Sequence, residues 1–434
     1  MVSFEMIISF QWRRHLIRSL LITCICFFAF GCLNNQILQG ERLEIYTDPL
    51  AKFRNTNGRE INLGVQQNLS VISQVDNGPT HHFRHSSFGT LVSKAWETSV
   101  LKAGSLSAPV FTDSNILIVD GESNLVSLDL LGKEVWVTNL APNPGSRQKS
   151  QHSGGLAVLK NKIYVLTGFG EIIALDILKG TVLWRSKFDS PFRGPPVIEN
   201  NRLYAVTAND LAIAMSLDGK ILWTLEGATK PTIIGKGVAP SSSGNRVYLP
   251  FSAGVLKAVR SSNGSEVWSQ SFDDAIKGEA KAVIGDFGGS PIIKSGKIFL
   301  VSVSGQLLAV NLNNGKIAWK APVGSRSTPL IVGGSIFVSS SSGYLVRLSE
   351  KNGTIFWARK INAKGRKKIE YFGPTLAGGH LWIIGTDGML RKFDPVTGEQ
   401  VSDYDVKGSV LYRPFAAHGK LFVVRRSGKL IAFK

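Results

Sequence analysis

One short pattern recurs along the chain and limits what the chain can fold into. The stretch AVNLNNGKIAWKAPV, residues 309–323, has six looser copies: SLDLLGKEVW, ALDILKGTVLW, AMSLDGKILW, AVRSSNGSEVW, RLSEKNGTIFW and, without the tryptophan, KFDPVTGEQVS. A catalytic site is usually formed once in a chain, whereas a pattern at regular spacing indicates a repeated structural unit.

Tryptophans anchor the repeat, and their spacing indicates its size. The shortest interval is the 38 residues from 319 to 357, and the longest is the 51 residues from 268 to 319. Such intervals are typical of the blades of a β-propeller. The anchors are Trp96, Trp136, Trp184, Trp223, Trp268, Trp319 and Trp357, and Ser402 stands in the eighth place.

One complete unit, residues 288–323, contains four short apolar runs separated by Gly, Ser or Asn. These runs predict four strands joined by tight hairpins. A glycine stands four residues before each anchor except Trp96, and it provides the positive φ that a short hairpin needs. We expect each tryptophan to point from the outermost strand into the contact with the neighbouring blade, where its large apolar area fixes the angle between blades.

Eight such groups account for nearly all of residues 91–434 and leave no room for a second domain. The last group has only three runs, so we expect residues 91–100 to supply its outer strand and close the ring, since closure removes exposed sheet edges. The predicted fold is all-β, an eight-bladed β-propeller of four-stranded antiparallel blades. The groups lie near 107–140, 154–188, 194–227, 238–272, 288–323, 326–361, 372–406 and 411–434.

Residues 1–31 have the features of an export signal. A basic region precedes an apolar run at residues 20–30, which is too short to span a bilayer as a helix. The following AFGC fits either an ordinary signal or a lipoprotein signal that is cleaved before Cys32. Because the other two cysteines, Cys24 and Cys26, lie within the signal, the mature chain has one thiol, and acylation gives Cys32 a purpose. We therefore expect a lipoprotein.

Two further details bear on targeting. The residue after Cys32 is Leu33 and not an aspartate. In exported lipoproteins with such a signal, this usually implies sorting to the outer membrane. WRRHLIR, residues 12–18, resembles a twin-arginine signal, although a plain basic region explains it more simply. We expect the mature protein to be lipid-anchored at the periplasmic face of the cell outer membrane.

Residues 32–90 are polar and irregular, so we expect a lipidated N-terminus followed by a flexible tether. The histidines His81, His82 and His85 of this segment could suggest a metal site. No carboxylate or cysteine accompanies them at ligand spacing, so we expect chance clustering and no metal.

The chain is strongly basic. Its formal net charge of +19 falls to +17 when residues 1–31 are removed, because these carry three arginines and one acid, Glu5. Such a surface favours acidic partners or anionic headgroups. The alternative is that the basic residues are scattered over the surface and have no specific use. We expect no nucleic-acid partner. The one dense basic run, KGRKK at residues 364–368, is either a solvated loop between repeats or a contact with lipid.

The sequence lacks the chemistry of the propeller enzymes. Quinoprotein dehydrogenases with eight tryptophan-anchored blades hold pyrroloquinoline quinone and calcium between converging carboxylates, and they typically carry a vicinal disulfide. The mature chain has no cysteine pair, and a solvated inter-blade loop is the simpler explanation for its best acidic cluster, Asp273, Asp274 and Asp286. No HExxH motif, nucleophile elbow or zinc-type pair is present. We therefore expect no cofactor and no catalysis.

An exported, cysteine-poor propeller with these repeats resembles the BamB family, lipoproteins of the outer-membrane β-barrel assembly machinery. The resemblance runs from about residue 88 to the end, and FGPTLAGGHLWIIGTDG (372–388) is among its most specific segments, with residues 193–223 and 285–319. These segments look most like the alphaproteobacterial branch, in which a long segment precedes the propeller.

The resemblance implies a non-catalytic scaffold that docks on the POTRA domains of the machinery's barrel subunit and helps to deliver or orient unfolded outer-membrane proteins. In the family, docking uses an apolar-apolar-Arg loop and a neighbouring pair of acids. Gly235 replaces that arginine here, and Gly288 replaces the second acid, so two charged contacts differ. The matching partner-binding residues are Ile233, Ile234, Lys236 and Asp286.

Two other functions are compatible with the same repeats. One is a PQQ-dependent periplasmic dehydrogenase, which the absorbance of the purified protein and calcium-dependent dye reduction would reveal. The other is a propeller that binds a ligand in its axial funnel.

Overall fold

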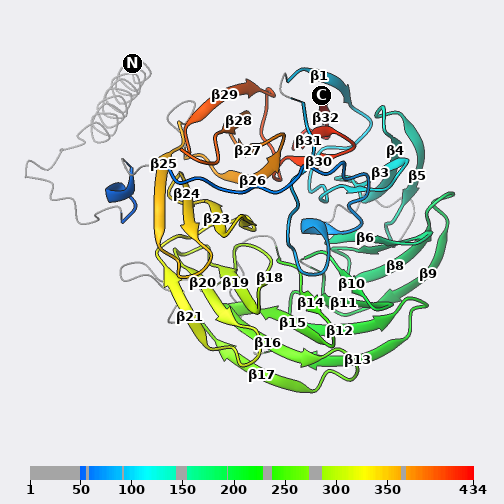
Figure 1. The fold of residues 1–434 in the computed structure, drawn as a ribbon. Coiled ribbons are helices and arrows are strands. Elements are labelled where there is room, and N and C mark those ends of the chain that lie inside the picture. Colours follow the sequence, from blue (N-terminus) through cyan, green and yellow to red (C-terminus); the bar gives the residue numbers. More distant parts are fainter. Residues whose placement is uncertain are drawn as a thin grey trace, which may run out of the picture. The chain divides into compact units, whose positions relative to one another are not determined.

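Eight four-stranded antiparallel sheets surround a common axis, which confirms the predicted eight-bladed β-propeller (Figure 1). The structure is a computed structural model. It describes residues 49–54, 58–89, 92–142, 154–192, 194–227, 237–272, 286–362 and 368–434, all of which belong to the unit Pro49–Lys434.

The blades are numbered in chain order, and the strands of each run from the axis to the rim. Blade 1 consists of β2 (Val110–Phe111), β3 (Asn115–Val119), β4 (Asn124–Asp129) and β5 (Glu134–Asn139). Blade 2 consists of β6 (Gly155–Leu159), β7 (Lys162–Leu166), β8 (Glu171–Asp176) and β9 (Val182–Lys187). Blade 3 consists of β10 (Val197–Glu199), β11 (Arg202–Val206), β12 (Leu211–Ser216) and β13 (Ile221–Glu226). Blade 4 consists of β14 (Ser241–Ser243), β15 (Arg246–Phe251), β16 (Val255–Arg260) and β17 (Glu266–Ser271).

The second half of the ring repeats this order. Blade 5 consists of β18 (Ile292–Lys294), β19 (Lys297–Val301), β20 (Leu307–Asn311) and β21 (Ile317–Ala321). Blade 6 consists of β22 (Leu330–Val332), β23 (Ser335–Ser339), β24 (Tyr344–Ser349) and β25 (Ile355–Lys360). Blade 7 consists of β26 (Tyr371–Ala377), β27 (His380–Gly385), β28 (Met389–Phe393) and β29 (Gln400–Asp405). Three short 3-10 helices complete the described elements: η1 (Ala51–Phe53), η2 (Val75–Asn77) and η3 (Ser252–Gly254).

Blade 8 closes the ring with strands from both ends of the propeller. Its inner strands are β30 (Phe415–Ala417), β31 (Lys420–Val424) and β32 (Leu430–Phe433), and its outer strand is β1 (Lys94–Thr98). Trp96 lies opposite Ala432 in the β1–β32 pair. The expected closure by the N-terminal strand is therefore confirmed.

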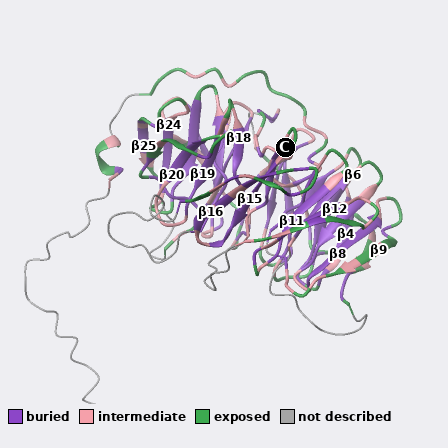
Figure 2. Cartoon of the chain, turned by 90° about the horizontal axis from the view of Figure 1, so that it is seen from below, coloured by how far each residue is buried: buried purple, intermediate pink, exposed green. Residues whose placement is uncertain are grey.

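The hydrophobic core is divided among the eight contacts between neighbouring blades. The middle strands of each blade are apolar on both faces because each blade packs between two others; Ile116, Leu117 and Ile118 of β3, for example, are fully buried. The rim strands alternate between exposed and half-buried residues. Figure 2 shows the buried residues concentrated in the strands.

Aspartates and glycines form the tight hairpins at the rim. In blade 1, Asp129 Oδ1 accepts hydrogen bonds from the backbone N–H groups of Leu131 and Lys133, both at 2.9 Å. Gly132 follows with φ +82°, in the left-handed region that favours glycine. Local side-chain and backbone preferences therefore determine where the third and fourth strands meet.

Each anchor tryptophan packs against the hairpin glycine of the next blade, as expected. The contacts join Trp96 to Gly132, Trp136 to Gly180, Trp184 to Gly219, Trp223 to Gly264, Trp268 to Gly315, Trp319 to Gly353 and Trp357 to Gly398. Several indoles also donate across the same junction, as Trp357 Nε1 does to Val396 O at 2.8 Å. The tryptophans are therefore wedges between blades.

Blade 7 lacks a tryptophan on its rim strand because Ser402 stands in that place. Trp382 of the second strand, β27, replaces it; this indole is fully buried and donates to Ala377 O at 3.0 Å. Its ring centroid lies 6.3 Å from that of Tyr404 on β29. The tryptophan spacing did not predict this substitute, because Trp382 stands in the second strand, where most other blades carry a tyrosine or phenylalanine such as Tyr164 or Phe337.

The expectation of a flexible tether is wrong for residues 58–89, which we call the strap. The strap crosses the ring at one end of the axis (Figure 1), and single β-bridges join Ile72 to Phe111, Gln74 to Ala157, and Ser86 to Ala377. These bridges use the free edges of inner strands in blades 1, 2 and 7. Exposed strand edges attract further strands, and here the chain's own segment covers them.

Buried contacts with blades 5 and 6 hold the beginning of residues 49–89. Arg347 of blade 6 is only 2% exposed, and its guanidinium donates to the backbone carbonyls of Arg59 and Glu60. Leu50, next to η1, is buried in the core between blades 5 and 6. The described part of residues 49–89 is thus an integral part of the folded body.

Candidate functional site

The two ends of the ring differ because one of them carries the strap. The hairpins that join first to second strands lie at the strap end; the N–H of Gly378, for example, donates to Ser86 O at 3.0 Å. The chain leaves each rim strand at the opposite end, where the N–H of Gly227 donates to Asp210 O at 2.8 Å and that of Phe272 to Gly254 O at 2.9 Å. We call this opposite end the connection end.

A cavity of about 330 Å³ lies on the axis, and every blade contributes to its wall. Its size falls within the range of small-molecule sites. Its apolar, aromatic and charged lining includes Val238, Phe287, Arg326, Thr328, Glu370, Phe372, Tyr412, Arg413 and Arg426.

The strap contributes Val75 and Asp76 to the cavity wall at one end. Asp76 Oδ2 accepts from Thr328 Oγ1 at 2.7 Å, and Gln74 forms two hydrogen bonds with the backbone of Ile198, at 3.1 Å and 2.8 Å. These contacts connect the strap to blades 3 and 6. The axial cavity therefore ends at the strap.

Arg413 is a buried cation in the wall of this cavity, with 7% of its surface exposed. Its guanidinium donates to Ser327 Oγ at 3.2 Å and to the backbone oxygens of Thr328 and Pro374. The ring of Phe83, on the strap, lies 4.1 Å from the guanidinium carbon. Burial lowers the pKa of Arg413, and the negative charge of Asp76 opposes that shift.

The acceptors of Arg413 within the described residues are neutral oxygens, not carboxylates. At the connection end the cavity wall carries Arg326, whose Nε lies 3.9 Å from Glu370 Oε1 in a half-exposed pair, and the exposed Arg426. The charged lining is thus three arginines against two carboxylates, and the field in the cavity favours anions.

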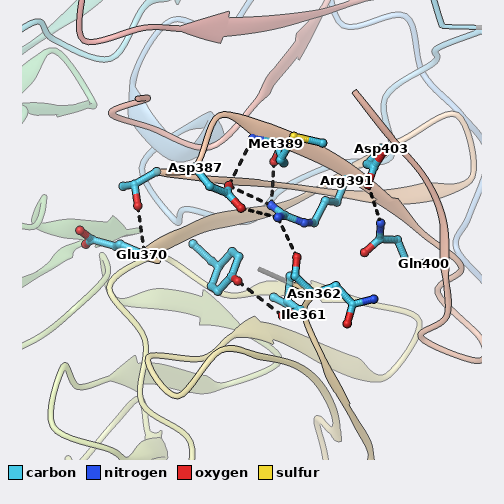
Figure 3. A network of polar contacts seen from close by, with 10 residues as sticks. Ile361, Asn362, Glu370, Asp387, Met389, Arg391, Gln400 and Asp403 are labelled. Atoms are coloured by element: carbon cyan, nitrogen blue, oxygen red, sulfur yellow. Dashed lines mark hydrogen bonds and ion pairs between the residues drawn. The ribbon is translucent and has the colours of Figure 1, made fainter. Parts of the chain in front are cut away.

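A buried ion pair stabilises the connection end beside blade 7 (Figure 3). Arg391 and Asp387 are 2% and 3% exposed, and Arg391 Nη1 donates to Asp387 Oδ1 at 3.1 Å. The same guanidinium donates to Asn362 O at 2.8 Å. Arg391 therefore fixes the backbone of Asn362, which is the last described residue before the basic run at 364–368. Of that run, only Lys368 is described.

Three of the four residues predicted to contact a partner, Ile233, Ile234 and Lys236, lie outside the described residues, as do Asp273, Asp274 and Cys32. Asp286 is described and 6% exposed. Its carboxylate accepts from the backbone N–H of Ala253 in η3 at 3.2 Å. Asp286 thus connects the residues before blade 5 to blade 4 and has little surface to offer a partner.

The three histidines of the strap bind different parts of the ring. His81 Nε2 lies 2.7 Å from Pro240 O, and His82 Nε2 lies 3.1 Å from Ile331 O. His85 Nε2 accepts from the N–H of Gly379 at 3.0 Å. Each imidazole is therefore an attachment point of the strap. Within the described residues, no group of three or more potential metal-ligating side chains was found.

Sequence reasoning missed Arg347, Arg413 and the strap contacts. Both arginines lie at positions that the repeat fills with other residue types: Arg347 lies opposite Trp357, where several other blades have alanine. For Arg347, a basic residue in an otherwise apolar strand was the available signal, whereas Arg413 lies before β30 and outside any strand. Among the described residues, no helix is long and apolar enough to cross a membrane.

The fold and the wedge at each junction define an eight-bladed propeller of tryptophan-anchored repeats. Residues 122–359 match the family model described as "Outer membrane protein assembly factor BamB". This match covers more than half of the chain, so the protein belongs to the BamB family.

Curated relatives agree with this assignment. The BamB of Yersinia pestis is 23% identical over 350 residues, which are 78% of this chain and 88% of that protein. The BamB of Moranella endobia is 25% identical over 222 residues, 50% of this chain. That second match spans 57% of the relative's own length.

Solved structures share the fold. BamB from Moraxella catarrhalis superposes with a TM-score of 0.63 at 16% identity and covers 80% of this chain and 98% of its own. Quinohemoprotein alcohol dehydrogenase from Comamonas testosteroni has the same TM-score at 14% identity, covering 84% of this chain and 80% of its own. Such identities establish the architecture alone, which accommodates both assembly factors and enzymes.

Proposed function

We propose that this protein is a non-catalytic accessory subunit of the outer-membrane β-barrel assembly machinery. The observation that carries the proposal is the family match over residues 122–359, on a ring whose strap forms part of the wall of the axial cavity. Acylation of Cys32 anchors the mature chain at the periplasmic face of the outer membrane. The propeller then presents surfaces to a partner and to unfolded outer-membrane proteins.

The connection end is the docking surface in this proposal. Residues 228–236 and 273–285 join blades 3 to 4 and 4 to 5, and their described neighbours Gly227 and Phe272 lie at that end. Ile233 and Ile234 provide the apolar contact with a POTRA domain of the barrel subunit, and Lys236 provides the charge. Asp286 is buried, and its hydrogen bond from the N–H of Ala253 positions the end of the segment 273–285.

A pull-down from solubilised outer membranes tests this function. The full chain, carrying an affinity tag, should recover a β-barrel subunit with POTRA domains, and Ile234→Asp should reduce that recovery at least tenfold because the charge would be buried in an apolar contact. The matched control is Leu178→Asp, at a 78% exposed residue of the β8–β9 hairpin, which should recover the subunit normally.

Two results contradict the proposal. Recovery of the native chain without any POTRA-bearing subunit contradicts the function, and equal recovery by both variants contradicts the docking segment alone. The dehydrogenase alternative predicts quinone absorbance and calcium-dependent dye reduction in the purified protein. Absence of both signals from the protein prepared with added quinone and calcium is the result that our proposal expects.

A further inference from the structure

The axial cavity has a property that docking at the connection end does not use. It lies at the centre of the ring, about 330 Å³ in volume, and the strap forms the wall at one end through Val75 and Asp76. A ligand in the cavity would therefore contact the strap at that end. A space of this size suits a small molecule and is too small for a folded domain.

The wall combines aromatic surface with a buried cation. Phe287, Phe372 and Tyr412 line the cavity from blades 5, 7 and 8, and Val238 adds aliphatic surface from blade 4. Arg413 lies among them at 7% exposure. Apolar walls with a few convergent polar groups are the usual composition of a ligand site.

The charge of Arg413 is incompletely balanced. Its hydrogen-bond acceptors among the described residues are one hydroxyl and two backbone oxygens, and its remaining contact is the face of Phe83. Buried charges in proteins are normally paired, because desolvation without a counter-charge is costly. The charge of Asp76 acts on Arg413 without a hydrogen bond between them, and Asp76 Oδ2 accepts from Thr328 Oγ1 instead.

The second carboxylate of the lining, Glu370, faces Arg326 and does not neutralise Arg413. Arg426 adds a further positive charge at the connection end. The three arginines outnumber the two carboxylates of the lining, so the net charge of the wall favours an anion over a cation. The chemistry that fits is an anionic group attached to an apolar body.

We propose that the axial cavity is a binding site for a small amphipathic carboxylate, whose anionic group pairs with Arg413 and whose apolar part packs on Phe287, Phe372 and Tyr412. A guanidinium forms charge-assisted hydrogen bonds to a carboxylate, and these are stronger than those to a neutral amide. The site is independent of docking on a barrel subunit, and failure of either proposal leaves the other standing.

Calorimetric titration of the purified full chain with 2-naphthoate and its neutral isostere 2-naphthamide tests the proposal. The carboxylate should bind at least about tenfold more tightly than the amide. Arg413→Met should remove that preference and retain the weak apolar binding. Lys179→Gln, at an exposed lysine of the β8–β9 hairpin, is the control for general attraction to a basic surface and should leave the preference unchanged.

Arg413 also connects blades 6, 7 and 8, so its variant is checked by thermal unfolding. If Arg413→Met does not fold, Arg326→Gln decides, because this half-exposed side chain is in the cavity wall and its ion pair with Glu370 is long, at 3.9 Å; the preference should then fall at least threefold. Equal affinity for the two naphthalenes, no binding of 2-naphthoate, or a preference unchanged in both arginine variants would overturn the proposal.

Discussion

The indole of Trp319 in blade 5 lies on Gly353 in the β24–β25 hairpin of blade 6, so closely that a Cβ added to Gly353 would come 2.5 Å from Cε3 of the ring. Gly353 also has φ +72°. The glycine therefore meets two requirements together: the turn needs the left-handed backbone, and the neighbouring blade needs the space that a side chain would fill.

The first prediction separates these two requirements. Gly353→Ala should lower the free energy of unfolding by the cost of a left-handed alanine, about 1–2 kcal/mol, plus about 1–3 kcal/mol for the clash with the indole. Gly334→Ala is the control, because Gly334 has φ +71° and no atom within 4 Å of an added Cβ. Denaturant unfolding measures both; equal losses would show that the wedge contact tolerates a methyl group.

The second prediction concerns the wedge itself. Trp319→Ala should cost about 3–5 kcal/mol, as truncation of large aromatic residues in cores does. In the Trp319→Ala background, Gly353→Ala should cost no more than Gly334→Ala does, because the indole that the methyl group would meet is gone. A double-mutant cycle measures this coupling. Strict additivity would contradict the assignment of Trp319 as the blade spacer.

The third prediction concerns the buried ion pair of blade 7. Asp387→Asn should cost about 3–5 kcal/mol, because it leaves the 2% exposed guanidinium of Arg391 without its counter-charge. The double variant Asp387→Leu with Arg391→Met should recover much of that loss, since neither charge then remains buried. Thermal and denaturant unfolding provide the values. A loss in the double variant as large as in the single one would indicate that packing, not charge, sets the cost.

The fourth prediction is a pH dependence of strap attachment. Burial lowers the pKa of His82 below its ordinary 6.5, and the charges of Lys294 and Arg84 act in the same direction, while the Ile331 carbonyl and Glu350 oppose them. The unfolded chain therefore binds the proton more readily than the folded one. The stability that neutral His82 contributes is present above pH 6.5 and is lost as the pH falls below that value.

His82→Asn keeps a donor for the Ile331 carbonyl and removes the titrating group. Free energies of unfolding measured between about pH 5 and pH 8 should therefore fall less steeply toward acid in this variant than in the native chain. Parallel curves for the two proteins would show that His82 does not titrate differently in the folded state.

The blades could be predicted because their determinants are local and repeated. The hairpin glycine, the aspartate before it and the tryptophan after it lie within one short segment, so spacing alone located all eight sheets and the closing strand. Trp382 escaped prediction because it replaces the missing rim indole from a different strand. Its position is aromatic in most blades, as Tyr164 and Phe337 are, so the rim-strand spacing of the tryptophans did not point to it.

The strap and the cavity could not be predicted for a different physical reason. Residues 58–89 have no repeat, and their partners are backbone groups far away in sequence, such as Gly379, which lies 294 residues from His85. Any residue can supply a backbone carbonyl, so composition does not reveal the pairing. Arg413 likewise acquires its role only when Phe83 and Thr328 are brought to it by the closed ring.

The strap imposes an order on how this molecule can be assembled. Its partners extend from Phe111 to the N–H of His418, which donates to Leu69 O at 2.8 Å, and β1 pairs with the final strand β32. The bridges to blades 1 and 2 can form early, but β1 and the strap's contacts to blades 7 and 8 must wait until the end of the chain has been synthesised. Long sequence separations of this kind slow folding and prolong the exposure of unpaired strand edges. A chaperone that binds nascent chains should therefore matter more for this protein than the stability of its folded form would suggest.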